Sequence, residues 1–169
     1  MNKIAFTLIL IVLTASTTRA LSVDDLAPAF SLRDSNGEYY YFSDHIGPTK
    51  KQHVKGIIIN FFASYCEPCK RELPVLNSLV KELNEKGVKV VIVGFKENFD
   101  KINILLDQIK VDKPIILSDT YGKTGQKYGV THLPITFFIN ADGKVTDVIR
   151  GELPNLEKVF REKSGKLLK

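Results

Sequence analysis

The clearest hydrophobic pattern lies in the middle of the chain, where residues 56–62 are apolar apart from Asn60. A short apolar run of this kind is typical of a strand that is buried on both faces of a sheet. Residues 66–86 then place leucine and valine at helical spacing, and Gly87 is suited to end that helix. Residues 88–95 are again apolar and predict a second strand. The strand–helix–strand order predicts a right-handed parallel crossover.

The segments on either side of this unit also have recognisable patterns. Asn36-Gly37 separates two apolar or aromatic runs and predicts an N-terminal β-hairpin. Pro74 lies inside the long helix, and we expect it to kink that helix or to delay its regular start. The remaining elements are predicted, in chain order, as a helix over 101–109, a strand over 114–117, a helical turn over 121–128, a strand over 135–139, a strand over 144–150 and a helix over 154–163.

The first twenty residues have the pattern of a secretory signal. Lys3 supplies a positive charge, residues 4–13 are largely apolar, and residues 18–20 include small residues suited to cleavage. The apolar run is shorter than the roughly 20 residues that a spanning helix needs, so a cleaved signal is favoured over a retained anchor. We therefore expect a signal peptide at 1–20, a single domain at 21–169, and a periplasmic or otherwise exported location.

The charge of the chain indicates no particular partner. The formal net charge is +5, and about +3 remains without Lys3 and Arg19 of the predicted signal. This small excess is spread along the sequence, so it does not indicate nucleic-acid binding.

The two cysteines of the chain, Cys66 and Cys69, stand where the first buried strand meets the helix. Unpaired N–H groups and the helix dipole at that position favour a thiolate on Cys66. Pro68 suits the first helical turn, where its missing N–H is not needed. The two sulfurs are close enough along the chain to form a reducible disulfide. This arrangement indicates thiol–disulfide exchange.

Other uses of the cysteine pair fit the sequence less well. A structural zinc site needs about four ligands, and no second Cys or His pair stands at ligand spacing. Covalent haem attachment needs a histidine where Lys70 stands, and a structural disulfide would more often join distant segments. Thiol peroxidases carry a Pro-x-x-x-Thr-x-x-Cys pattern, but Ile59 and Ala63 occupy those two positions. We expect no metal and no other cofactor.

Residues 61–74 closely resemble the active-site segment of thioredoxin-like proteins of the TlpA/ResA type. Leu133-Pro134 and residues 27–30 resemble further landmarks of that family, so the resemblance covers nearly the whole chain after the signal. It implies an α/β thioredoxin-like fold, with a central mixed sheet flanked by helices, an N-terminal β-hairpin and an inserted α-β element. It also implies an exported oxidoreductase, often a reductant in cytochrome c maturation, which a membrane protein recharges with electrons.

The resemblance and the chemistry of the residues together suggest catalytic roles. Cys66 is expected to attack a client disulfide, and Cys69 to resolve the mixed disulfide. Glu72, one helical turn after Cys69, matches the family's acid and is expected to accept the proton of Cys69; the alternative is a first-turn acid favoured by the dipole. Asn60 stands where thioredoxin has a buried aspartate, and Tyr65 replaces the usual tryptophan.

The expected client-binding surface lies around the sulfurs. Pro134 matches the cis proline of the family, which would present the Leu133 backbone to a client strand; a trans proline at a strand start is the alternative. We interpret His132 as a histidine on a surface loop; the alternatives are that it lies near the sulfurs and assists a thiolate, or that it binds copper. The client-binding residues predicted in this way are Tyr65, Glu67, Pro68, Leu133 and Pro134.

The direction of electron flow is open at this stage. The charge of Glu67 is expected to disfavour the Cys66 thiolate and so to favour an electron donor, whereas the helix dipole acts in the opposite sense. We expect a protein-disulfide reductase that acts as a monomer on client proteins and receives electrons from a membrane protein. The alternatives are a disulfide-forming oxidase or isomerase, a thiol-based metal-delivery module, and a non-catalytic interaction domain.

Overall fold

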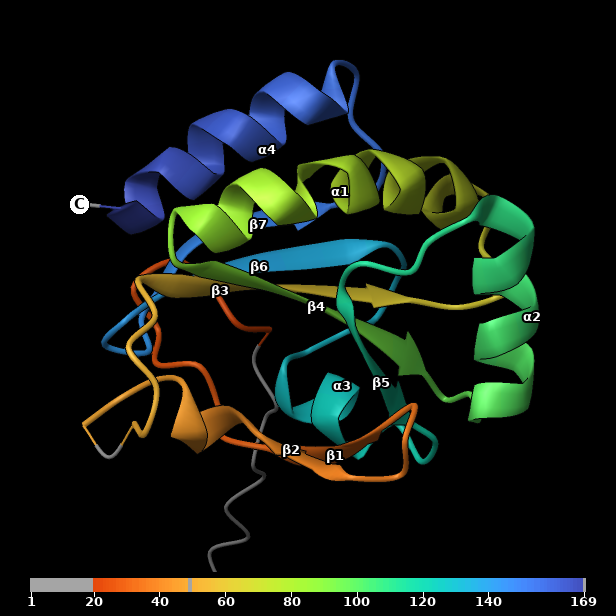
Figure 1. The fold of residues 1–169 in the computed structure, drawn as a ribbon, viewed down its shortest axis with the longest axis horizontal. Coiled ribbons are helices and arrows are strands. Elements are labelled where there is room, and N and C mark those ends of the chain that lie inside the picture. The colour runs from red at the N-terminus through yellow and green to blue at the C-terminus, as the bar shows by residue number, and fades with distance from the viewer. Residues whose placement is uncertain (1–19, 49, 169) are drawn as a thin grey trace, which may run out of the picture.

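A computed structural model of the chain describes residues 20–48 and 50–168 (Figure 1). The predicted signal lies almost wholly outside these residues. Within them, no helix has the length and apolar character needed to cross a membrane. The elements, in chain order, are β1 (Ser31–Asp34), β2 (Tyr39–Tyr41), the 3₁₀ turn η1 (Phe42–Asp44), β3 (Gly56–Phe62), α1 (Glu67–Glu85), β4 (Val88–Phe95), α2 (Phe99–Ile109), β5 (Ile115–Asp119), α3 (Lys123–Lys127), β6 (Ile135–Asn140), β7 (Val145–Arg150), α4 (Leu156–Gly165) and η2 (Lys166–Leu168).

The strands form one mixed sheet in the order β2-β1-β5-β4-β3-β6-β7. β3 pairs in parallel with β4 and antiparallel with β6, and β4 pairs in parallel with β5. The predicted β3–α1–β4 crossover is therefore confirmed. β1 and β2 form the predicted hairpin at one margin of the sheet, and its turn contains Gly37 at a φ of 81°, a conformation that glycine adopts readily.

The core has two halves because successive residues of β3 point to opposite faces of the sheet. Ile58 and Phe62 contribute to the half under α1, α2 and α4, whereas Ile57, Ile59 and Phe61 contribute to the half under the N-terminal segment, the hairpin and α3. Figure 1 shows α1 and α4 together on one side of the sheet and α3 with the hairpin on the other. All five side chains are fully buried, so β3 is the centre of the domain.

α1 begins without a delayed start, which was one of the two effects that we expected from Pro74. It starts at Glu67 and continues through Pro74 as one helix to Glu85. Pro74 cannot donate the backbone hydrogen bond of that turn, but the helix is held by its packed face. Leu73 and Leu76 on either side of the proline are both fully buried. Tertiary packing therefore outweighs the local effect of proline here.

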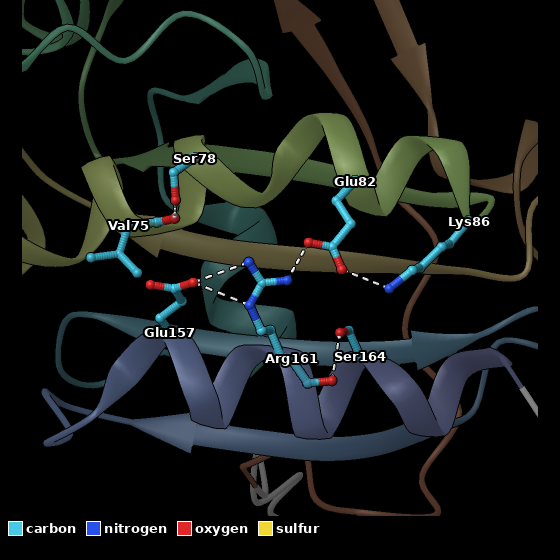
Figure 2. A network of polar contacts seen from close by, with 7 residues as sticks. All are labelled: Val75, Ser78, Glu82, Lys86, Glu157, Arg161 and Ser164. Atoms are coloured by element: carbon cyan, nitrogen blue, oxygen red, sulfur yellow. Dashed lines mark hydrogen bonds and ion pairs between the residues drawn. The ribbon is translucent and has the colours of Figure 1, made fainter.

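α4 packs beside α1, and charged side chains connect the two helices (Figure 2). Arg161 of α4 binds Glu82 of α1 and also binds Glu157 of its own helix at 3.0 Å. Lys86 completes the network, with its Nζ 2.6 Å from the Glu82 carboxylate. These groups are solvent-exposed, so water screens them and they orient the helices more than they stabilise them. The apolar contact of α4 comes chiefly from Phe160, which is fully buried.

Candidate active site

The two cysteines lie at the start of α1 and are joined as a disulfide, with their Cα atoms 5.3 Å apart. Cys66 is the N-cap residue, and its sulfur accepts a hydrogen bond from the Cys69 N–H at 3.3 Å. Cys66 keeps 7% of its surface exposed, whereas Cys69 has none. The predicted placement is therefore confirmed: one cysteine caps the helix and is the more accessible, and the other is buried one turn behind it.

A groove of about 540 Å³ opens beside Cys66. Tyr65 is 71% exposed at this groove, so its ring is available to a partner. Four of the five predicted client-binding residues line the groove, and so do three residues that we did not assign to that surface. The lining residues are Tyr65, Cys66, Glu67, Pro68, Phe95, Thr131, His132 and Leu133.

Pro134, the fifth predicted residue, is buried next to Leu133 of the groove, and the Leu133–Pro134 peptide bond is cis. His132 is exposed, as the interpretation of a surface loop requires, and its Nδ1 lies 3.1 Å from the Thr131 hydroxyl. It also lines the groove at Cys66. Phe95 could not be recognised from its surroundings in the sequence, because it reaches the groove only through the pairing of β4 with β3.

Glu72 is buried in a polar cluster and is not a solvated first-turn acid. Only 1% of its surface is exposed, and its Oε1 accepts hydrogen bonds from Asn60 Nδ2 at 2.6 Å and from the Thr136 hydroxyl at 3.0 Å. Asn60 and Thr136 lie directly opposite each other on β3 and β6. Burial raises the pKa of Glu72 to about 7, against the effect of the hydrogen bonds from Thr136 and Asn60. Glu72 Oε2 has no hydrogen-bond partner among the described residues.

The position of Asn60 in the sequence did not reveal the contacts that it makes in this cluster. Asn60 cannot accept a proton, as the sequence indicated, but it donates hydrogen bonds to both Glu72 and Thr136. The carboxyl group of this cluster therefore lies on helix α1, and side chains of β3 and β6 hold it in place. A carboxyl with a pKa of about 7 can bind and release a proton at neutral pH.

Glu67 has less influence on Cys66 than we expected. The Glu67 carboxylate lies 2.5 Å from Lys70 Nζ, and this hydrogen bond and the charge of Lys70 lower the pKa of Glu67. The carboxylate is exposed to water and paired with a cation, so its field at the neighbouring sulfur is largely offset. The direction of electron flow therefore needs a basis other than Glu67.

The described residues include no group of three or more His, Cys, Asp or Glu side chains placed to hold a metal ion. The features of this site are therefore a capping cysteine, a buried cysteine and a buried carboxyl group on one helix. A family model described as the AhpC/TSA family matches residues 23–148. The chain belongs to the AhpC/TSA family.

Within the AhpC/TSA family, the chain is similar to proteins named thiol-disulfide oxidoreductase ResA. It is 35% identical to the Bacillus subtilis protein over 127 residues, which cover 75% of this chain and 66% of that protein. It is 31% identical to the Bacillus cereus protein over 137 residues, which cover 81% of this chain and 75% of that protein.

A comparison with solved structures agrees with this similarity to thiol–disulfide oxidoreductases. The crystal structure of a DsbE-type thiol:disulfide interchange protein from Chlorobium tepidum matches with a TM-score of 0.77 and 27% identity, over 89% of this chain and 100% of that one. The thioredoxin-like fold expected from the sequence is thus confirmed. The chain has the fold and the paired cysteines of a ResA-type thiol–disulfide oxidoreductase.

Proposed function

We propose that this chain is an exported disulfide reductase that acts on client proteins through a mixed disulfide. The observation that carries the proposal is the arrangement of three side chains on one helix: Cys66 caps α1 beside an open groove, and Cys69 and Glu72 are buried behind it. Such a site can present one reactive sulfur to a client while it shields the second sulfur and its proton acceptor.

The exchange has two steps that balance in atoms and electrons. In the first, the Cys66 thiolate attacks one sulfur of the client disulfide, and the other client sulfur leaves as a thiolate. In the second, Cys69 gives its proton to Glu72 and attacks the Cys66 sulfur, which releases the second client thiolate. The client gains two electrons, and the Cys66–Cys69 pair becomes the disulfide seen in the structure.

The composition of the groove supports the reducing direction. Strong oxidants of this chemistry stabilise the thiolate of their reduced form, often with a nearby cation. The residues that line the groove at Cys66 include neither lysine nor arginine, and the one basic side chain among them is that of His132. A thiolate without a lysine or arginine beside it is less stable, so the reduced form gives up its electrons more readily.

Export and the identity of the client complete the proposal. The signal pattern of residues 1–20 supports delivery outside the cytoplasm, followed by cleavage near Ala20. The resemblance to the TlpA/ResA type makes apocytochrome c the first client to test and a membrane electron donor the expected source of reducing power. Mass spectrometry of the protein recovered from the exported fraction tests the cleavage site, and a retained N-terminus would contradict it.

The decisive measurement is the equilibrium of the Cys66–Cys69 couple with dithiothreitol and glutathione. We expect a midpoint potential below about −250 mV, in the range of reducing thioredoxins. A potential near about −120 mV would instead assign the oxidase alternative. A Cys69→Ser variant should accumulate mixed disulfides that name the clients, and a Cys66→Ser variant, which lacks the attacking sulfur, is the matched control.

A further inference from the structure

A second buried carboxylate reaches the active-site loop from the neighbouring strand. Glu97 follows β4 and is only 4% exposed. Its Oε2 accepts a hydrogen bond from the Ser64 N–H at 2.7 Å, and its Oε1 accepts one from the Ser64 hydroxyl at 2.6 Å. Ser64 lies two residues before Cys66, in the loop that joins β3 to α1. Both carboxylate oxygens act as acceptors, which is the hydrogen-bonding pattern of an ionised group.

The segment that carries Glu97 is itself held firmly by β5. The Ser118 hydroxyl donates to the Glu97 carbonyl at 2.7 Å, and the Lys96 N–H donates to the Asp119 carbonyl at 3.0 Å. Lys96 has a φ of 59°, a left-handed conformation that residues other than glycine seldom adopt. These contacts maintain a turn that directs the Lys96 side chain to solvent and the Glu97 side chain inward.

We propose that Glu97 is a positioning residue that lowers the redox potential of the Cys66–Cys69 couple through the negative charge that its hydrogen bonds with Ser64 fix beside the active-site loop. The inference rests on the thiol–disulfide exchange proposed above. Reduction adds two electrons to the S–S bond and leaves a thiolate on Cys66 and a thiol on Cys69, which takes up one proton.

Glu97 acts on this couple through its fixed charge. Its negative charge, fixed beside the loop, raises the free energy of the Cys66 thiolate. Its two hydrogen bonds with Ser64 hold the carboxylate in this place. The reduced form becomes less stable, and the couple becomes a stronger electron donor.

The alternative is that Glu97 only anchors the loop, and two variants separate charge from anchorage. Glu97→Gln keeps the length of the side chain and can both accept from the Ser64 N–H and donate to its hydroxyl, but it removes the charge. Glu97→Asp keeps the charge but is one methylene shorter, so it cannot reach Ser64 with the same geometry. Glu38→Gln removes an exposed charge in the N-terminal hairpin and is the matched control.

The test is the equilibrium of each full-length variant with dithiothreitol, together with the rate of Cys66 alkylation as a function of pH. We expect Glu97→Gln to shift the equilibrium about tenfold towards the dithiol, a potential about 30 mV less negative, and to move the alkylation midpoint to lower pH. Glu97→Asp should stay within about threefold of the wild type, and Glu38→Gln within about twofold.

Several results would overturn the inference. A Glu97→Gln variant with the equilibrium and alkylation profile of the wild type would show that the charge has no effect. A larger shift in Glu97→Asp than in Glu97→Gln would show that anchorage, and not charge, sets the potential. If Glu97→Gln does not fold, Glu97→Ala replaces it, and equal shifts in Glu97→Ala and Glu97→Asp would show that the charge has no effect. A wild-type protein that fails to exchange disulfides at all would refute the proposed function rather than the role of Glu97.

Discussion

Replacing Glu72 with glutamine tests the catalytic role of the buried carboxyl. In the Glu72→Gln variant the amide oxygen could still accept the hydrogen bonds from Asn60 and Thr136, but the side chain could not take the proton of Cys69. The first step of the exchange does not use Glu72, so the variant should form the mixed disulfide at the normal rate. The second step should slow by about 100-fold at pH 8, the lower end of the usual contribution of a general base.

The pH dependence gives the prediction a second, independent magnitude. With the pKa of Glu72 at about 7, roughly nine tenths of the carboxyl is ionised at pH 8, half at pH 7 and a tenth at pH 6. The rate of the second step in the wild type should fall in the same proportions as the pH is lowered. The Glu72→Gln variant should lack this inflection.

The two steps can be followed separately with a colorimetric aromatic disulfide as the substrate. The reduced protein releases the first aromatic thiolate when Cys66 attacks and the second when Cys69 resolves the mixed disulfide, so a stopped-flow trace reports both rates. Glu85→Gln, an exposed change in the last turn of the same helix, is the control. Equal slowing of both phases, or an unchanged second phase, would refute the role of Glu72 as proton acceptor.

Three further predictions concern stability and are measured by urea unfolding of the oxidised protein. The pKa of Glu72 is raised from 4.5 to about 7, so the stability that its protonation provides is complete below pH 4.5 and is lost as the pH rises to about 7. The free energy of unfolding of Glu72→Gln should therefore rise by about 3 kcal/mol relative to that of the wild type between pH 4.5 and 8. A difference that stays constant with pH would contradict this. Phe160→Ala should lower the free energy of unfolding by about 3–5 kcal/mol, because it empties a fully buried site under α4, and a loss below about 1 kcal/mol would argue against that packing. Asn77→Ala should lower the free energy of unfolding by about 1–3 kcal/mol, because the N–H groups of Asp112 and Lys113 donate to the Asn77 side chain at 3.2 and 2.9 Å. It should also speed amide exchange at these two residues, and unchanged exchange there would contradict the prediction.

The extent of each element could be predicted where local pattern decides it. β3 and β4 have the bounds expected from their apolar runs, because both strands are buried on two faces and end at a glycine or a loop. The helices differ by one or two residues at their ends, where capping decides. α2 starts at Phe99 because the Asn98 side chain accepts from the Lys101 N–H at 3.4 Å, and α4 starts at Leu156 after Asn155, whose φ is 55°.

The candidate site could be predicted only in the part that lies on one segment. Cys66, Cys69 and Glu72 stand within seven residues of one another, so helical spacing was enough to place them together. Thr136 comes from β6, and Glu97 comes from the loop that follows β4. They reach the site because β6 pairs with β3 in a particular register and because β4 ends beside it. No periodicity along the chain records such a register, so tertiary structure was needed to find them.

The interior position of β3 in the sheet also determines where residues can be inserted without disturbing the active site. Hydrogen-bonded neighbours flank β3 on both sides, and packed residues cover both of its faces. Its amide protons should be among the last to exchange with solvent, since they are released only when the whole domain opens. The two cysteines follow just beyond the end of this strand. Residues could therefore be added at the outer strands β2 and β7 while the reacting sulfur atoms keep their positions.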